Sequence, residues 1–235
     1  MPGHEVNKIY GEWTWHGGSE IEPARTALII VDMQKFYCYP ESDYRQAIAR
    51  AFGRDLDAWG ERMRSQVIPN TARVLEAFRE HDMCVVHLIT GSWREDRSDM
   101  PRRFKDFMNR LEQHGKIDNV YGSPELEIVD DLAPQKGELI LRKVTGSGFL
   151  TTRLDQALRD MGMSYIVLAG ISSDGCVLHT ALDGYDLGYS ETLVTDASTT
   201  YDPDTHALIC NLYKTNWGRA LSTDQIIEEI RQRTE

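Results

Sequence analysis

An α/β fold built around a mainly parallel sheet is predicted by the alternation of apolar runs and amphipathic segments along the chain. The apolar runs are continuous, which is typical of strands that helices cover on both faces. They lie at 26–31, 83–89, 138–141, 166–169 and 190–194. A chain of 235 residues with 41% hydrophobic residues can bury a core of its own, and this length does not require a second domain.

The first 25 residues differ from the rest of the chain. They are polar, include Trp13 and Trp15, and show neither a helical nor a strand period. We expect residues 1–25 to form an N-terminal arm. Two indoles are costly to leave in water, so the arm should pack on the body of the protein or on a neighbouring subunit. A single domain is expected over 26–235, and its first strand ends directly before Asp32.

Helices are expected between the strands. The expected helices lie at 44–63, 69–80, 104–114, 152–161, 203–213 and 222–231, with one more that begins at Cys176. Gly53 and Gly60 weaken the first of them, because glycine is a poor helix former. The segment 90–119 is charged and irregular, and a connection this long in a compact domain is typical of a lid or a pocket wall.

Cys176 follows a buried strand and a tight loop, and it opens a helix. The N-terminus of a helix carries unpaired N–H groups and a partial positive charge, and both favour a thiolate. We therefore expect the pKa of Cys176 to be lowered. A packed core cysteine is the alternative from this segment alone, since free cysteine is among the most buried residue types. His179 is expected on another face of the helix, which argues against a Cys–His pair.

The composition excludes several classes of function. The formal net charge is −11, from 26 Lys and Arg against 37 Asp and Glu, and there is no long basic run. Nucleic acid and anionic membrane surfaces are therefore poor partners. The four cysteines are widely spaced, which argues against a zinc ribbon or a disulfide framework and fits a reducing compartment. With neither an export signal pattern nor a membrane-spanning run, we expect a cytoplasmic protein.

Three residues suited to chemistry lie at the ends of three different strands, namely Asp32, Lys143 and Cys176. In open parallel sheets, ligands bind at the edge formed by the carboxyl ends of the strands. Taken singly, Asp32 could cap a turn and Lys143 could be a solvated surface charge. Taken together, a thiol, a carboxylate that can accept its proton and an ammonium that can stabilise charge are what nucleophilic catalysis at a carbonyl needs.

Three sequence segments carry a family resemblance. They are Asp32-Met33-Gln34, the segment from Lys143 to Phe149 and the segment from Gly170 to Val177. In order and spacing they resemble the three signatures of the isochorismatase-like cysteine hydrolases, and the resemblance covers about 26–221. It implies a three-layer α/β/α Rossmann-like fold whose six-stranded parallel sheet has the order 3-2-1-4-5-6.

The resemblance also implies roles for individual residues. Asp32, Lys143 and Cys176 would form a catalytic triad, and the backbone N–H groups of Ser172 and Cys176 would form an oxyanion hole. A non-proline cis peptide is implied between Ile171 and Ser172. In the implied strand order the third strand lies roughly 10 Å from the first. Lys143 therefore has to extend across the sheet edge to reach Asp32.

The implied activity is that of a cysteine-dependent amidohydrolase. It would cleave a C–N bond of a small linear amide, carbamoyl or ureido compound through a thioester intermediate, with release of ammonia. The motifs look most like the branch of ureidoacrylate, biuret and N-carbamoylsarcosine amidohydrolases. Tyr37 and Trp93 fall where that branch places pocket aromatics, with plain packing as the alternative for these two, and Phe149 is a third candidate for substrate binding.

Cofactors and alternative functions can be weighed from the same segments. Nicotinamidases of this family carry an Asp-x-His metal motif where this chain has Thr90 to Trp93, so neither a metal nor another cofactor is expected. A vinyl-ether hydrolase of the isochorismatase type is one alternative, but that chemistry needs no thiol. A non-catalytic family member that serves as an interaction subunit is the other. We expect a small-molecule substrate and a homo-oligomer, either a dimer or a tetramer.

Overall fold

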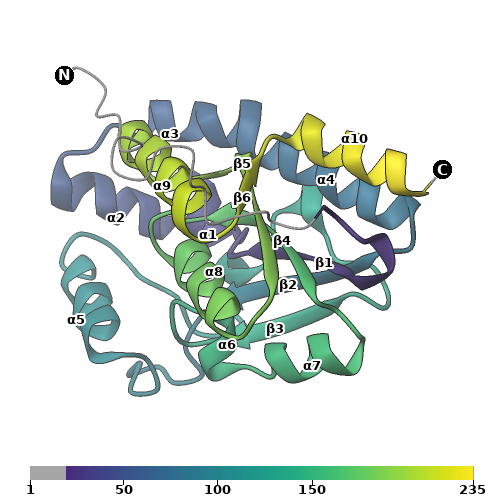
Figure 1. Cartoon of the computed structure of the whole chain (residues 1–235). Coiled ribbons are helices and arrows are strands. Elements are labelled where there is room, and N and C mark those ends of the chain that lie inside the picture. Colours follow the sequence, from purple (N-terminus) through teal and green to yellow (C-terminus); the bar gives the residue numbers. More distant parts are fainter. Residues whose placement is uncertain (1–19, 235) are drawn as a thin grey trace.

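The computed structural model describes residues 20–234 and contains one six-stranded sheet in which all paired strands are parallel (Figure 1). Its order, β3-β2-β1-β4-β5-β6, confirms the predicted fold class. The strands are β1 Thr26–Val31, β2 Cys84–Thr90, β3 Leu139–Lys143, β4 Tyr165–Ile171, β5 Ser190–Thr199 and β6 Arg219–Leu221. The sequence patterns missed β6, which has three residues and no buried residue to mark it.

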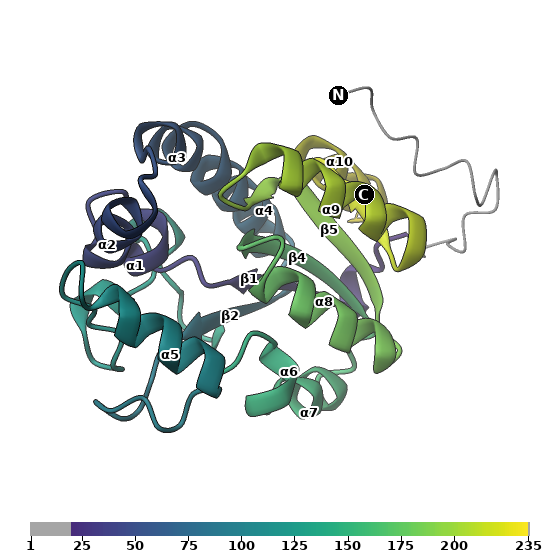
Figure 2. The same cartoon turned by 90° about the vertical axis from the view of Figure 1, so that its left-hand side faces the viewer.

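Helices cover both faces of the sheet (Figure 2). The side chains of β1 alternate between the two resulting cores: Leu28 and Ile30 face one, and Ala27 and Ile29 face the other. The first core is completed by α1 Lys35–Cys38, α2 Asp43–Phe52, α3 Asp57–Arg62, α4 Ile68–Glu80, α5 Arg102–Leu111 and α10 Thr223–Thr234. The second is completed by α6 Gly148–Thr151, α7 Leu154–Asp160, α8 Cys176–Asp186 and α9 Pro203–Asn216.

The predicted helix at 44–63 is two helices. Gly53 adopts a left-handed conformation with φ of 60° and ends α2, because its backbone N–H turns back to the carbonyl of Ala49. The chain then resumes as α3 and runs through a π-helical turn, Met63–Val67, into α4. The expected start of the next helix at Pro69 lies one residue inside α4.

The N-terminal arm can be followed only from residue 20, and the expectations for Trp13 and Trp15 lie outside the described residues. Ile21 is buried in the first core, and its backbone N–H donates to Glu229 Oε1 of α10 over 2.5 Å. Glu20 forms an ion pair with Arg233 of the same helix. The described end of the arm thus packs on the body of the protein. Within residues 20–234, no helix combines the length and hydrophobicity that a membrane crossing requires.

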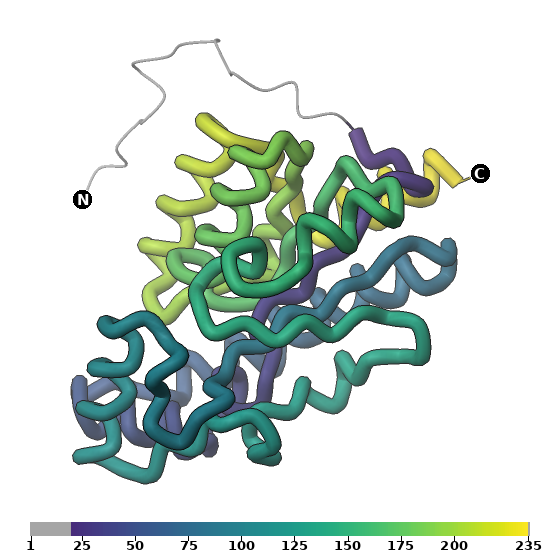
Figure 3. Tube along the Cα trace, turned by 90° about the horizontal axis from the view of Figure 1, so that it is seen from below, coloured from purple at the N-terminus to yellow at the C-terminus, as the bar shows by residue number. Residues whose placement is uncertain are grey.

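The connection between β2 and β3 is organised by a buried arginine. Arg97, which is 5% exposed, donates hydrogen bonds to Asn119 Oδ1 at 2.6 Å, to the carbonyl of Ile117 at 2.7 Å, to Asn109 Oδ1 at 3.0 Å and to Glu112 Oε1 at 2.6 Å. These bonds tie the end of α5 and the segment after it to one side chain. The helix α5 lies next to α2, and both are at one end of the molecule (Figure 3).

The sheet edge is set by close strand pairing. Gly170 of β4 pairs with Val31 of β1 and has φ of +115°, and a Cβ at this position would lie 2.1 Å from the carbonyl oxygen of Val31. Only glycine can hold this position without moving one strand away from the other. The contact brings the ends of β1 and β4 together, and these are the strands that precede Asp32 and the loop to Cys176.

We therefore expect Gly170→Ala to destabilise the protein more than Gly188→Ala does. Gly188 has φ of +89°, and a Cβ added there would meet no atom within 4 Å, so alanine should cost only the left-handed strain, about 1–2 kcal/mol. Alanine at position 170 adds overpacking of roughly 1–3 kcal/mol. Urea unfolding of the two variants measures the difference. Equal losses would show that the strands separate without cost.

Candidate active site

A buried ion pair lies at the carboxyl edge of the sheet. Lys143 Nζ is 2.9 Å from Asp32 Oδ2, and the two side chains are 0% and 4% exposed. Thr90 Oγ1 donates to Asp32 Oδ1 over 2.8 Å, and Lys143 also donates to Thr90 Oγ1 and to the carbonyl of Thr145. These bonds offset the desolvation of both charges. Burial is the largest single effect and would lower the pKa of Lys143, but the charges and hydrogen bonds of Asp32 and Cys176 together outweigh it, and the pKa is raised.

The separation of Lys143 from Asp32 in the sheet is bridged by the lysine side chain. Lys143 is the last residue of β3 and pairs in register with Thr90 of β2. Its long side chain passes Thr90 and reaches Asp32, which directly follows β1. A shorter side chain could not cross the intervening strand.

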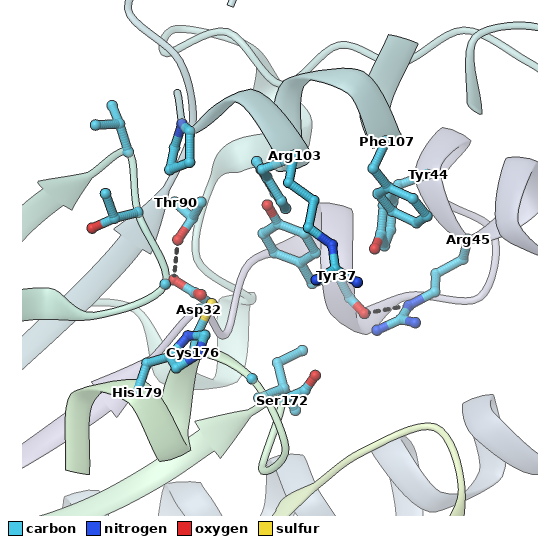
Figure 4. Close-up of a pocket in the computed structure, with 17 residues that line it drawn as sticks. Asp32, Tyr37, Tyr44, Arg45, Thr90, Arg103, Phe107, Ser172, Cys176 and His179 are labelled. Carbon is cyan, nitrogen blue, oxygen red and sulfur yellow. Dashed lines mark hydrogen bonds between the residues drawn. The ribbon is translucent and has the colours of Figure 1, made fainter. Parts of the chain in front are cut away.

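Cys176 is the first residue of α8, next to Asp32 (Figure 4). Burial raises the pKa of Cys176, the Asp32 carboxylate raises it further, and Lys143 lowers it; the net value is about 12. The expectation of a lowered pKa is therefore wrong. It counted the helix N-terminus and left out burial and the neighbouring carboxylate, which act in the opposite direction. Burial and the carboxylate thus both favour the thiol form of Cys176 over the thiolate.

The loop before Cys176 contains the cis peptide bond between Ile171 and Ser172 that the family resemblance implied. The carbonyl of Ser172 accepts hydrogen bonds from the N–H groups of Gly175 at 2.9 Å and Val177 at 3.1 Å. Among the loop and cap hydrogen bonds of the described residues, none is donated by the backbone N–H of Ser172 or of Cys176. Both residues line the cavity described next.

A cavity of about 460 Å³ opens above the thiol. Asp32, Thr90, Ser172, Cys176 and His179 line its floor (Figure 4). The opposite wall comes from α1, α2 and α5 and includes Tyr37, Tyr44, Arg45, Arg103, Phe104 and Phe107. The cavity thus has a polar end beside the thiol and an aromatic and cationic end away from it.

Of the three residues predicted to bind substrate, the structure places one in this cavity. Tyr37 lines it, and its buried hydroxyl has no hydrogen-bond partner among residues 20–234. Trp93 lies outside the cavity lining, 58% exposed against the Tyr121 ring. Phe149 lies outside it too and stacks on Tyr189, because α6 docks against α8 in the second core.

Sequence reasoning missed or misplaced four residues of the site. Thr90, Arg45 and Arg103 were not singled out, since only the packing of distant segments brings them to the cavity. His179 was placed on another face of α8, yet it lines the cavity beside Gly146, where a Cβ would lie 2.2 Å from its Nδ1. The spacing of Cys176 and His179 was the available signal, since residues three apart on a helix share a face.

The geometry of the site can be compared with known proteins. The family model of the isochorismatase domain matches residues 26–225. Ureidoacrylate amidohydrolase RutB of Caulobacter vibrioides (strain ATCC 19089 / CIP 103742 / CB 15) is 31% identical over 78% of this chain and 81% of its own length. The enzyme of the same name from Pantoea ananatis is 30% identical, over 91% of this chain and 85% of its own length.

Solved structures with a similar fold were also found. A cysteine hydrolase from Pseudomonas syringae pv. phaseolicola 1448A superposes with a TM-score of 0.75 at 25% identity, over 92% of this chain and 96% of that one. N-carbamoylsarcosine amidase from Thermoplasma acidophilum shares the fold, with a TM-score of 0.63 at 23% identity over 85% and 97% of the two chains. The fold and the matched residues define a Rossmann-like hydrolase. The chain belongs to the isochorismatase family.

We predict that Asp32→Asn and Lys143→Met shift the pKa of Cys176 in opposite directions. Removing the carboxylate should lower the thiol pKa and speed alkylation by iodoacetamide at pH 8, whereas removing the ammonium should raise the pKa and slow it. In the wild type the rate should rise about tenfold per pH unit from roughly 7 to 10, because the thiol pKa lies above this range.

Mass spectrometry of the Cys176 peptide measures these rates, with circular dichroism as the check on folding. Cys38, which is fully buried, serves as the internal control and should remain unlabelled in all three proteins. Slower alkylation in Asp32→Asn would mean that the carboxylate already activates the thiol in the resting protein.

Proposed function

We propose that the protein is a cysteine-dependent amidohydrolase of small linear amide, carbamoyl or ureido compounds. The observation that carries this proposal is the buried Asp32–Lys143 pair beside the Cys176 thiol on the floor of the cavity. The names of the ureidoacrylate amidohydrolase relatives support the choice of substrate class. The particular substrate stays open within that class.

The proposed reaction begins with proton transfer from Cys176 Sγ to the Asp32 carboxylate as the sulfur attacks the carbonyl carbon. The negative charge that develops on the carbonyl oxygen is held by the N–H groups of Ser172 and Cys176. The C–N bond then breaks, Asp32 returns its proton to the leaving nitrogen, and ammonia departs. A thioester between Cys176 and the acyl group remains.

Water completes the cycle. Asp32 takes a proton from a water molecule as the water oxygen attacks the thioester carbon. The C–S bond then breaks, and Asp32 passes the proton to the sulfur to restore the thiol. Lys143 keeps its proton throughout, since its pKa is raised, and its charge stabilises the carboxylate of Asp32. Thr90 orients the other carboxylate oxygen. Tyr37, with its unpartnered hydroxyl, is proposed to donate a hydrogen bond to the substrate.

Two alternatives receive less support. Hydrolysis of a vinyl ether needs no thiol, and an interaction subunit needs no polar cluster buried at a cavity. No cofactor enters the proposed reaction, since Asp32 performs every proton transfer. A cytoplasmic location is proposed because all four cysteines are free thiols. The homo-oligomer, a dimer or a tetramer, stays a prediction.

Ammonia release from a panel of ureido acids, carbamoyl compounds and primary amides tests the proposal. We expect Cys176→Ala to abolish release from any accepted substrate. Asp32→Asn should reduce turnover about 10²-fold to 10⁴-fold even though its thiol is alkylated faster, because the proton has no acceptor. Cys210→Ala is the matched control, since that thiol lies on α9 outside the cavity lining. Full activity of Cys176→Ala would overturn the cysteine mechanism.

A further inference from the structure

One arginine of the cavity wall is buried without a carboxylate partner. Arg45 of α2 is 8% exposed. Its Nε donates to the carbonyl of Tyr37 over 2.7 Å, and its guanidinium lies 3.7 Å from the centroid of the Trp59 ring. No ion pair joins it to an acidic side chain within residues 20–234. A buried cation without a counter-ion is unfavourable, so this position is suited to an anion that arrives with a ligand.

A second arginine reaches the same end of the cavity. Arg103 extends from α5 into the cavity toward Tyr37, on the side away from Cys176 (Figure 4). The described residues give it no ion pair either. Its neighbour Arg102, in contrast, points to solvent with a side chain 94% exposed and pairs with Asp106 at 3.7 Å.

The charges around the cavity do not balance. Among the described residues that line it, Asp32 is the one acidic residue, and its carboxylate is already paired with Lys143 and bonded to Thr90. The two guanidinium groups therefore leave the far end positive, in a chain whose formal net charge is −11. A positive pocket in an acidic protein favours an anionic ligand.

The far wall also carries apolar rings. Tyr44, Phe104 and Phe107 line it beside the two arginines, together with Pro101. A ligand that reaches this end therefore meets apolar surface next to the two guanidinium groups. The planar fork of a guanidinium matches the two oxygens of a carboxylate, or those of a phosphate-type group.

We propose that Arg45 and Arg103 form an anion subsite that selects substrates with an oxyanion, a carboxylate or a phosphate-type group, at the end remote from the scissile bond. That the bound anion is part of a substrate rests on the proposed function, but binding of the anion can be tested without turnover. Tyr37 links Arg45 to the cavity, since it lines the cavity and its carbonyl accepts the hydrogen bond from Arg45 Nε.

Protection of Cys176 from iodoacetamide measures that binding. Hexanoate and hexylphosphonate should protect the thiol at far lower concentration than hexan-1-ol, which has the same apolar chain and no charge. Arg103→Gln should raise the concentration of hexanoate needed for half protection about tenfold to hundredfold, because a charge-assisted contact is lost. Arg102→Gln removes the same charge from the same helix and should leave hexanoate protection unchanged.

The outcomes separate the two proposals. Equal protection by hexanoate and hexan-1-ol, or equal losses in the two arginine variants, would overturn the anion subsite whatever the catalytic activity. Stronger protection by hexylphosphonate than by hexanoate would support the subsite and assign it to phosphate-type groups. Because Arg103 is exposed on α5, its variant tests the subsite even if replacement of the buried Arg45 impairs folding.

For accepted ureido substrates, the ratio of kcat/KM between an acid and its alcohol counterpart gives a second readout. This ratio should fall about tenfold to hundredfold in Arg103→Gln and stay constant in Arg102→Gln. If the panel releases no ammonia while hexanoate still protects Cys176, the proposed function fails and the anion subsite stands. An unchanged ratio in Arg103→Gln would overturn the subsite and leave the amidohydrolase proposal intact.

Discussion

The ion pair between Asp32 and Lys143 is the constraint on which the site depends. Two opposite charges are held out of water across three neighbouring strands, and each additional hydrogen bond to them requires a fixed register of the sheet. Gln34 supplies part of this order: its side chain accepts from the N–H of Thr90 at 2.8 Å and donates to the carbonyl of Thr90 at 3.2 Å. Thr90 is thereby fixed from both sides, by its backbone and by its hydroxyl.

The same ion pair decides the state of the nucleophile. Burial and the Asp32 carboxylate raise the pKa of Cys176 from 9.0 to about 12, which disfavours the thiolate. The helix N-terminus contributes only about 0.3–1 kcal/mol in its favour. Burial and the Asp32 carboxylate therefore outweigh the helix N-terminus, and the thiol form is favoured until a base takes the proton of Cys176. The base that raises the thiol pKa is also the one placed to accept the proton, so a resting thiol is compatible with the proposed reaction.

The two ends of the cavity come from different parts of the fold. The catalytic end is built at the strand ends, where the positions of side chains follow from the parallel sheet. The far end is built from α2 and α5, and Arg97 holds α5 in place through bonds to residues of its own connection. Changes in the connection between β2 and β3 can thus alter what the cavity binds while the Asp32–Lys143 pair stays in place.

The sequence by itself determined five of the six strands and the three residues at the edge of the sheet. Continuous apolar runs mark buried parallel strands, and parallel strands end at one edge, so Asp32, Lys143 and Cys176 could be placed together from their positions in the chain. Only the tertiary structure decided that Arg45 and Arg103 share a cavity, that Trp93 and Phe149 lie outside it, and that Cys176 holds its proton. These properties depend on how segments far apart in the chain pack, and a pKa sums the burial and charges that this packing creates.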